Sequence, residues 1–181
     1  MTLKKLANKH IILFGFKHVG KTVIGERLAT VLQKNFIDLD NELEKYCDIQ
    51  HAQFLTCRQI MQLYDEHYYR KQERLVLQKI LQLPSAVIAL GGGTVLYENN
   101  QKEIKAHFLL HIIASPSLVF ERIMVAGRPA FFDSDKDPYE SFICLWEKRS
   151  AIYKKLTQYR VDNSTSLDNA IHQARVYFEN N

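Results

Sequence analysis

The sequence contains few cysteines, and it has no long apolar run. Cys47, Cys57 and Cys144 are odd in number and far apart, with neither CxxC spacing nor a His-rich tract. A disulfide framework and a zinc site are therefore not expected. No apolar stretch approaches the roughly 20 residues that span a bilayer, so we expect no membrane partner. The apolar run near the N-terminus is short, Lys17 and His18 end it, and no small-residue cleavage site follows. We therefore expect a cytoplasmic protein without a signal peptide.

The chain also lacks a strong excess of one charge. Its 24 Lys and Arg against 20 Asp and Glu give +4 at pH 7, and 46% of its residues are hydrophobic. These values exclude a disordered or acidic chain. Because the basic residues are scattered and form no stripe, a nucleic-acid partner is not expected. The length favours one compact domain over residues 1–181.

Short apolar runs alternate with amphipathic segments along the whole chain. The pattern predicts strands at 10–15, 36–40, 86–90, 107–113 and 159–161. It predicts helices at 21–33, at 98–106, from Pro116, at 139–156 and at 167–179. Within 41–82 it predicts a short helix after Asp40 and a longer one from about Cys57, with a polar joint at 48–53 between them. The polar, irregular segment 126–138 is the candidate mobile loop. The alternation predicts an α/β fold, with a parallel sheet of about five strands covered by helices on both faces.

The loop after the first strand carries the clearest motif. Residues 15–22 read GFKHVGKT and match G-x-x-x-x-G-K-[ST] between a strand and a helix. In this motif, backbone N–H groups and the helix N-terminus surround phosphate oxygens. Lys21 would reach the β- and γ-phosphates, and the Thr22 hydroxyl would ligate Mg²⁺. A plain glycine-bearing turn is the alternative interpretation, which the position after a buried strand disfavours. The predicted nucleotide-binding residues of the loop are Gly15, Lys17, His18, Val19, Gly20, Lys21 and Thr22.

Two carboxylates, Asp38 and Asp40, end the second predicted strand. Ligands bind beyond the carboxyl ends of strands in an open parallel sheet, and alternating strand positions point the same way. One carboxylate could assist the metal shell while the other accepts a proton from, or orients, an attacking hydroxyl. The alternative is that Asp40 only caps the next helix.

Gly91, Gly92 and Gly93 follow the third predicted strand, among only seven glycines in the chain. Three consecutive glycines let the backbone approach a small polar ligand and offer it N–H donors. A tight turn is the plainer interpretation, but it rarely needs three glycines in a row.

Two arginines suggest a small anionic acceptor. Arg149 falls on the apolar stripe of the helix predicted at 139–156, and a planar carboxylate is the best partner for a buried guanidinium. The alternatives for Arg149 are an internal ion pair with Glu73 or Asp40, or a place at the rim of the apolar surface. Arg70 lies three residues before Glu73, so Glu73 could simply orient it.

Two further arginines belong to this part of the chain: Arg128 lies within the irregular segment 126–138, and Arg122 precedes it. Arg128 could swing onto a γ-phosphate as a lid arginine, or it could be a solvated loop residue. Arg122 is expected on a solvated face or near the nucleotide.

Six motifs, in order, resemble those of the shikimate kinase family, small P-loop kinases related in fold to the nucleoside monophosphate kinases. They are GFKHVGKT, FIDLD, YYRKQE, LGGGTVL, GRPAF and EKRSAIY. Four features depart from the family pattern. The stretch from Asp40 to Arg70 is slightly longer than usual. His18 stands where the family loop usually has another glycine, and the lid reads Arg-Pro-Ala-Phe instead of Arg-Pro-Leu-Leu. No Arg or Pro stands at 162–166 to stack on adenine.

This resemblance implies a three-layer α/β/α P-loop kinase fold and a monomer, with substrate-binding helices in 41–82 and the lid in 126–138. It implies transfer of the γ-phosphoryl group of ATP to the 3-hydroxyl of shikimate, giving shikimate 3-phosphate and ADP. The reaction serves chorismate and aromatic amino acid biosynthesis. The catalytic residues would be Lys21, Asp40 and Arg128.

The resemblance also implies the remaining roles at the site. Thr22 would bind Mg²⁺, with Asp38 in the outer metal shell. The shikimate ligands would be Asp40, Arg70, Arg149 and the backbone of Gly91–Gly93. Arg128 would close over the transferring phosphoryl group and so contact the nucleotide. Two other functions stay open from the sequence: a related small-metabolite kinase, such as one acting on gluconate, and a nucleotide-binding regulator without an acceptor.

Overall fold

The centre of the molecule is a five-stranded sheet in the order β2-β3-β1-β4-β5, in which all neighbouring strands are parallel. The computed structural model describes residues 8–127, 132 and 137–179. The strands are β1 (Ile11–Phe14), β2 (Asn35–Asp38), β3 (Ala86–Ala89), β4 (Phe108–Ile113) and β5 (Arg160–Asp162). Every residue of β1 and β3 is buried, as their uninterrupted apolar runs require in a sheet covered on both faces. The predicted parallel sheet is confirmed.

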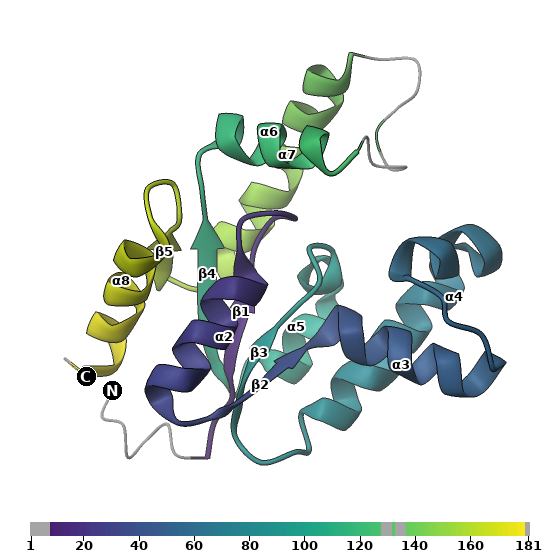
Figure 1. The fold of residues 1–181 in the computed structure, drawn as a ribbon, viewed down its shortest axis with the longest axis horizontal. Helices are drawn as coiled ribbons and strands as arrows, with labels where there is room; N and C mark the ends of the chain where they lie inside the picture. Colours follow the sequence, from purple (N-terminus) through teal and green to yellow (C-terminus); the bar gives the residue numbers. More distant parts are fainter. Residues whose placement is uncertain (1–7, 128–131, 133–136, 180–181) are drawn as a thin grey trace.

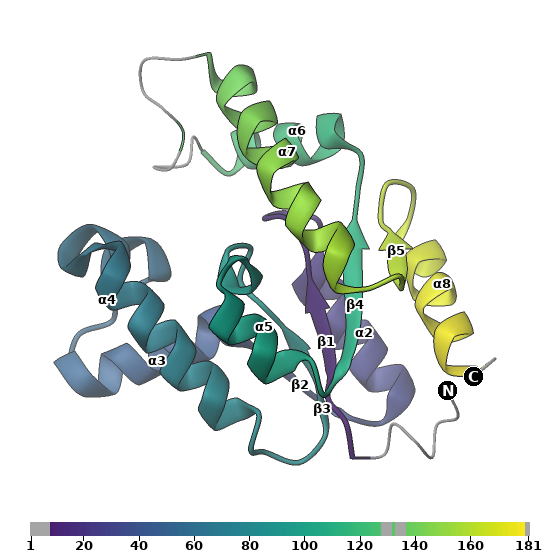
Figure 2. The ribbon, with the colours of Figure 1, turned by 180° about the vertical axis from the view of Figure 1, so that it is seen from behind.

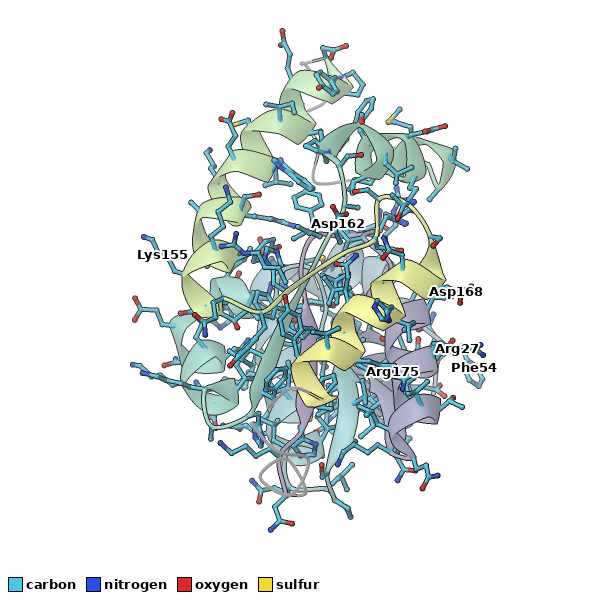
Figure 3. All side chains as sticks on the ribbon, turned by 90° about the vertical axis from the view of Figure 1, so that its left-hand side faces the viewer. Arg27, Phe54, Lys155, Asp162, Asp168 and Arg175 are labelled. Atoms are coloured by element: carbon cyan, nitrogen blue, oxygen red, sulfur yellow. The ribbon has the colours of Figure 1, made fainter. Side chains whose placement is uncertain are left out.

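Helices cover both faces of this sheet (Figures 1 and 2). They are α2 (Lys21–Leu32), α3 (Leu39–His51), α4 (Cys57–Ile80), α5 (Glu98–Ile104), α6 (Pro116–Val125), α7 (Pro138–Leu156) and α8 (Leu167–Glu179), with a 3₁₀ turn at Thr94–Leu96. In Figure 1, α2 lies in front of the sheet, and Figure 2 shows α5 and α7 in front of the opposite face. Helices α3 and α4 pack together beyond the β2 edge, and Figure 3 shows α8 along the β5 edge.

The boundary between α3 and α4 differs from the prediction. Helix α3 continues to His51, through most of the polar segment that we expected to be a joint. Helix α4 begins after Thr56, whose side chain accepts from the Gln59 N–H while Gln59 accepts from the Thr56 N–H. This capping box starts α4 at Cys57, where the sequence predicted it, so only the predicted end of α3 is wrong.

Helix α4 is kinked at Asp65, which has φ 73° and ψ 171°. The Asp65 carboxylate accepts a hydrogen bond from the Tyr68 N–H at 2.8 Å, as a helix cap does. The second half of α4 therefore starts anew at Asp65, and it carries Arg70 and Glu73.

The apolar stripe predicted on α7 faces the core. Phe142 and Tyr153 are buried, and Trp146 and Leu156 pack against the same core. Arg149 occupies the inward position between them, which confirms the spacing argument.

No helix in the described ranges 8–127 and 137–179 is both long and apolar enough to cross a membrane.

Candidate active site

The carboxyl ends of the five strands meet at one edge of the sheet, as parallel strands must. A cavity of about 590 Å³ opens there. The phosphate loop follows β1, Asp38 ends β2, the glycine run follows β3, and Asn163 follows β5. The motifs chosen from the sequence therefore lie at the same edge.

The phosphate loop depends on glycine at both of its ends. Gly15 has φ +147°, and a Cβ there would lie 2.2 Å from the Ile112 carbonyl oxygen. Gly20 has φ +96° and directly precedes α2. Other residues rarely adopt such backbone angles, so these glycines allow the loop to wrap around the N-terminus of α2.

Lys21 lies at the centre of this loop. Its Nζ donates to the carbonyl oxygens of Phe16 at 2.9 Å and Gly15 at 3.2 Å. Burial lowers the pKa of Lys21 to about 8, against the opposing effect of Asp40 and Asp38. An ammonium group buried at a helix N-terminus is well suited to bind phosphate.

Asp38 connects the phosphate loop to α3. One carboxylate oxygen accepts the Thr22 hydroxyl at 2.8 Å, and the other accepts from the backbone N–H groups of Asp40 and Asn41. Asp38 is thus the N-cap of α3. The capping role that was the alternative interpretation of Asp40 therefore belongs to Asp38. The predicted strand at 36–40 is wrong at its end, because this cap stops β2 at Asp38 and starts the helix at Leu39.

Asp40 therefore lies in the first helical turn of α3. The prediction that Asp38 and Asp40 point the same way because they alternate along a strand is wrong, since Asp40 is not in the strand. Its carboxylate lines the cavity, and the Oδ1 atom is buried without a hydrogen-bond partner among the described residues. Burial raises the pKa of Asp40, Asp38 adds to this, and Lys21 opposes it. A buried, unpartnered carboxylate oxygen facing a cavity is a ready acceptor for the proton of a ligand hydroxyl.

The glycine run passes close to three other parts of the site. A Cβ on Gly91 would lie 2.6 Å from Asp40 Oδ1, and one on Gly93 would lie 2.7 Å from the Arg70 guanidinium. On Gly92 it would lie 3.1 Å from the Lys17 backbone nitrogen. The absence of side chains thus lets this backbone approach both the phosphate loop and the side chains of Asp40 and Arg70.

Arg70 is held by two acidic residues. It donates to both oxygens of Glu73, at 3.1 and 3.2 Å, and lies 3.4 Å from Glu66. Glu73 is fully buried and also accepts from Thr94 at 2.9 Å. Burial favours the neutral guanidine, but Glu73 outweighs it and raises the pKa of Arg70. Orientation of Arg70 by Glu73, which the i+3 spacing suggested, is confirmed.

Arg149 reaches the same region from α7. Its guanidinium lies over the Phe16 ring, 5.4 Å from the centroid. Burial lowers the pKa of Arg149, against the effect of the neighbouring Tyr153 hydroxyl. The structure therefore brings a second cation beside Phe16 of the phosphate loop.

His18 occupies the left-handed region of backbone space, with φ 62°, at the position where a glycine was expected from the family pattern. Its carbonyl accepts from Arg122 at 3.2 Å. Burial lowers the pKa of His18, and the charges of Lys17, Lys21 and Arg122 add to the effect. Arg122 lines the cavity, and its contact with the nucleotide stays a prediction.

Sequence reasoning named no residue from one wall of the cavity, although the family resemblance placed the adenine loop at 162–166. Asn163, Thr165 and Leu167 line it from the loop between β5 and α8, the segment between the labelled Asp162 and Asp168 in Figure 3. The Asn163 amide donates to the Val19 carbonyl at 2.9 Å. The position of this loop after the last strand could have predicted that it lines the cavity. The absence of Arg and Pro from the loop gave no information about that.

Arg128 and most of the lid predicted at 126–138 lie outside the described residues.

Comparisons with known proteins agree with this geometry. The family model described as shikimate kinase matches residues 17–177. A shikimate kinase from Alkaliphilus oremlandii is 33% identical over 84% of this chain and 88% of its own length. A bifunctional shikimate kinase/3-dehydroquinate synthase from Thermotoga maritima is 30% identical over 85% of this chain, but only 29% of that longer protein is covered. The solved structure of shikimate kinase from Acinetobacter baumannii in complex with shikimate shares the fold. It has a TM-score of 0.81 at 22% identity and covers 96% of this chain and 93% of its own.

Proposed function

The chain belongs to the shikimate kinase family, and we propose that Asp40 is the carboxylate that activates the acceptor in its reaction. The chain is an ATP-dependent kinase, a transferase. It transfers the γ-phosphoryl group of ATP to the 3-hydroxyl of shikimate and releases shikimate 3-phosphate and ADP. The sequence left two alternatives open, a gluconate-type kinase and a regulator without an acceptor. The family match favours shikimate kinase over both.

Nucleotide binding is assigned to the phosphate loop and the adjoining wall of the cavity, which Asn163 joins to the loop. Gly15, the backbone from Lys17 to Gly20, and Lys21 would bind the phosphates. The base would lie toward the wall formed by Asn163, Thr165 and Leu167. The dipole of α2 and the buried ammonium of Lys21 support the place of the phosphates at the loop, because both neutralise phosphate charge.

The oxygen atoms of Thr22 and Asp38 fit Mg²⁺. Their side chains lie within 2.8 Å of one another beside the phosphate loop, and hydroxyl and carboxylate oxygens suit this hard cation. The residues that the structure describes contain no group of three His, Cys, Asp or Glu side chains that would hold a metal alone. That is the usual situation for Mg²⁺, which enters with nucleotide phosphates and keeps several waters. Bound there, Mg²⁺ would neutralise phosphate charge, with Thr22 as ligand and Asp38 in the outer shell.

Shikimate binding is assigned to Arg70, Arg149 and the N–H groups of Gly91–Gly93. The two guanidinium groups come from different helices. That of Arg70 borders Gly93, and that of Arg149 lies over Phe16 in the phosphate loop. Together they suit a small carboxylated polyol, since a planar guanidinium binds a carboxylate through two hydrogen bonds.

The unpartnered Oδ1 of Asp40 is the single observation that carries the catalytic assignment. In the proposed mechanism, this oxygen accepts the proton of the 3-hydroxyl as the hydroxyl oxygen bonds to the γ-phosphorus. The bond between the γ-phosphorus and the bridging oxygen breaks, and ADP leaves. Lys21 and the N-terminus of α2 stabilise the charge that develops on the phosphate oxygens.

Several expectations complete the proposal. Arg128 would close over the transferring group. The enzyme would act as a single-domain monomer in the cytoplasm, with no nucleic acid or membrane as partner.

The test is ADP release from MgATP with and without shikimate, for the wild type and for Asp40→Asn. We expect kcat to fall by about 10²–10⁴-fold in the variant, while ADP affinity stays within twofold. Asp48→Asn, eight residues further along the same helix, is the matched control and should retain wild-type turnover. Loss of ADP affinity equal to the loss of turnover would contradict the assignment, as would an Asp40→Asn enzyme with normal kcat.

A further inference from the structure

Tyr153 is a buried tyrosine of α7 that the proposed function leaves without a role. It is 1% exposed, and its ring contacts His111 and Phe14 at centroid distances of 5.4 and 6.0 Å. Its hydroxyl group, in contrast to the ring, has a polar partner. It donates a 2.5 Å hydrogen bond to the carbonyl oxygen of Gly92, in the glycine run 61 residues earlier in the chain.

The same hydroxyl interacts with Arg149, one helical turn earlier on α7. A hydrogen bond between the two side chains favours the charged guanidinium, although burial lowers the pKa of Arg149 overall. Burial raises the pKa of Tyr153 to about 12, against the effect of Arg149. The phenol therefore stays protonated near neutral pH and remains a hydrogen-bond donor. One hydroxyl group thus joins the glycine run to the arginine of α7.

We propose that Tyr153 is a positioning residue for the acceptor, because it fixes the orientation of the peptide group between Gly92 and Gly93. The Gly92 carbonyl and the Gly93 N–H belong to one planar trans peptide and point in opposite directions. Holding the oxygen toward α7 therefore turns the N–H away from α7. Because both flanking residues are glycines, no side chain limits the rotation of this peptide group. The hydrogen bond from Tyr153 limits it instead.

The surroundings of the run support this role. A Cβ on Gly93 would lie 2.7 Å from the Arg70 guanidinium, so this peptide borders the first arginine as well. Tyr153 thereby couples three groups that the proposed function assigns to shikimate: Arg149, Arg70 and the glycine backbone. The inference rests on that assignment.

A purely structural role for Tyr153 makes a different prediction. Phenylalanine would fill the same space against Phe14 and His111 and would leave the acceptor site unchanged. The hydroxyl is the part of the side chain that is bonded to the glycine run. Removing the hydroxyl alone therefore separates packing from positioning.

The experiment measures KM for shikimate, KM for ATP and ADP affinity in Tyr153→Phe. We expect KM for shikimate to rise about tenfold, the equivalent of one lost hydrogen bond, while KM for ATP and ADP affinity stay within twofold. KM does not depend on the fraction of folded enzyme, so partial misfolding does not obscure the result. Tyr177→Phe is the matched control, because it removes another phenol-to-carbonyl hydrogen bond, from α8 to the Arg160 carbonyl at 2.9 Å. It should leave both KM values unchanged.

Three outcomes would overturn the inference: an unchanged KM for shikimate, an equal rise in both KM values, or a variant that no longer binds ADP. Arg149→Ala, measured in parallel, tests the proposed function itself. If Arg149→Ala raises KM for shikimate and Tyr153→Phe does not, only the positioning role of Tyr153 fails. If neither does, the assignment of the acceptor site fails with it.

Discussion

A methyl group added to Gly91 would test whether the position of Asp40 limits catalysis. The added carbon would lie 2.6 Å from Asp40 Oδ1, 3.1 Å from Thr94 Oγ1 and 3.3 Å from Glu73 Oε1. Carbon and oxygen atoms in ordinary contact are at least about 3.4 Å apart, so the Asp40 carboxylate would move by roughly 1 Å. The other two oxygens belong to a buried hydrogen-bonded pair and have little freedom to move instead.

A displacement of this size at a reacting group costs about 10²-fold in rate, or about 2.7 kcal/mol. We therefore expect Gly91→Ala to lower kcat by roughly two orders of magnitude in the ADP-release assay. KM for ATP should stay within twofold, because the phosphate loop is not contacted by the new methyl group.

A double-mutant cycle identifies the cause. If the methyl group acts by displacing Asp40, the loss should nearly disappear when Gly91→Ala is added to Asp40→Asn, since the carboxylate is then already disabled. Equal losses in both backgrounds would refute the reasoning, as would a Gly91→Ala enzyme with wild-type kcat. The thermal unfolding midpoint of each variant serves as the control for folding.

Three further predictions concern backbone strain, pH and the support of Arg70. His18→Gly should raise the thermal unfolding midpoint by about 2–8 °C, because glycine relieves a left-handed backbone that costs a side chain about 1–2 kcal/mol; a lower midpoint would contradict this. The kcat/KM for ATP should fall as pH rises through about 8, where the buried Lys21 loses the proton that phosphate binding requires, and a profile flat well above that pH would refute the assignment. Glu73→Gln should raise KM for shikimate about tenfold and lower the free energy of unfolding by about 1–3 kcal/mol, measured by kinetics and denaturant titration, because Arg70 loses its charged partner. An unchanged KM would show that Glu73 does not orient Arg70 for the acceptor.

Most secondary-structure elements follow from short-range features of the sequence. The buried strands are uninterrupted apolar runs, and the phosphate loop is a contiguous motif whose two glycines adopt positive φ angles. The inward face of α7 follows from helical spacing alone, so the spacing was enough to predict the inward position of Arg149. Each of these depends on residues within a few positions of one another.

The structural context of Asp40 was harder to predict, because it depends on a contact between distant segments. Asp38 rather than Asp40 caps α3 while its other oxygen is bound to Thr22, which lies 16 residues earlier. The kink at Asp65 and the wall formed by the β5–α8 loop are likewise not marked by any periodic pattern.

The order of elements, the phosphate loop and the residue types available for catalysis can be read from the sequence alone. Which of those residues meet depends on the folded chain, as for Tyr153 with Gly92, Glu73 with Thr94, and Asn163 with Val19. The difference lies in the range of the interactions. Helix and strand periodicity and glycine angles are local properties, whereas burial and hydrogen bonding between distant segments exist only once the sheet has brought those segments to one edge.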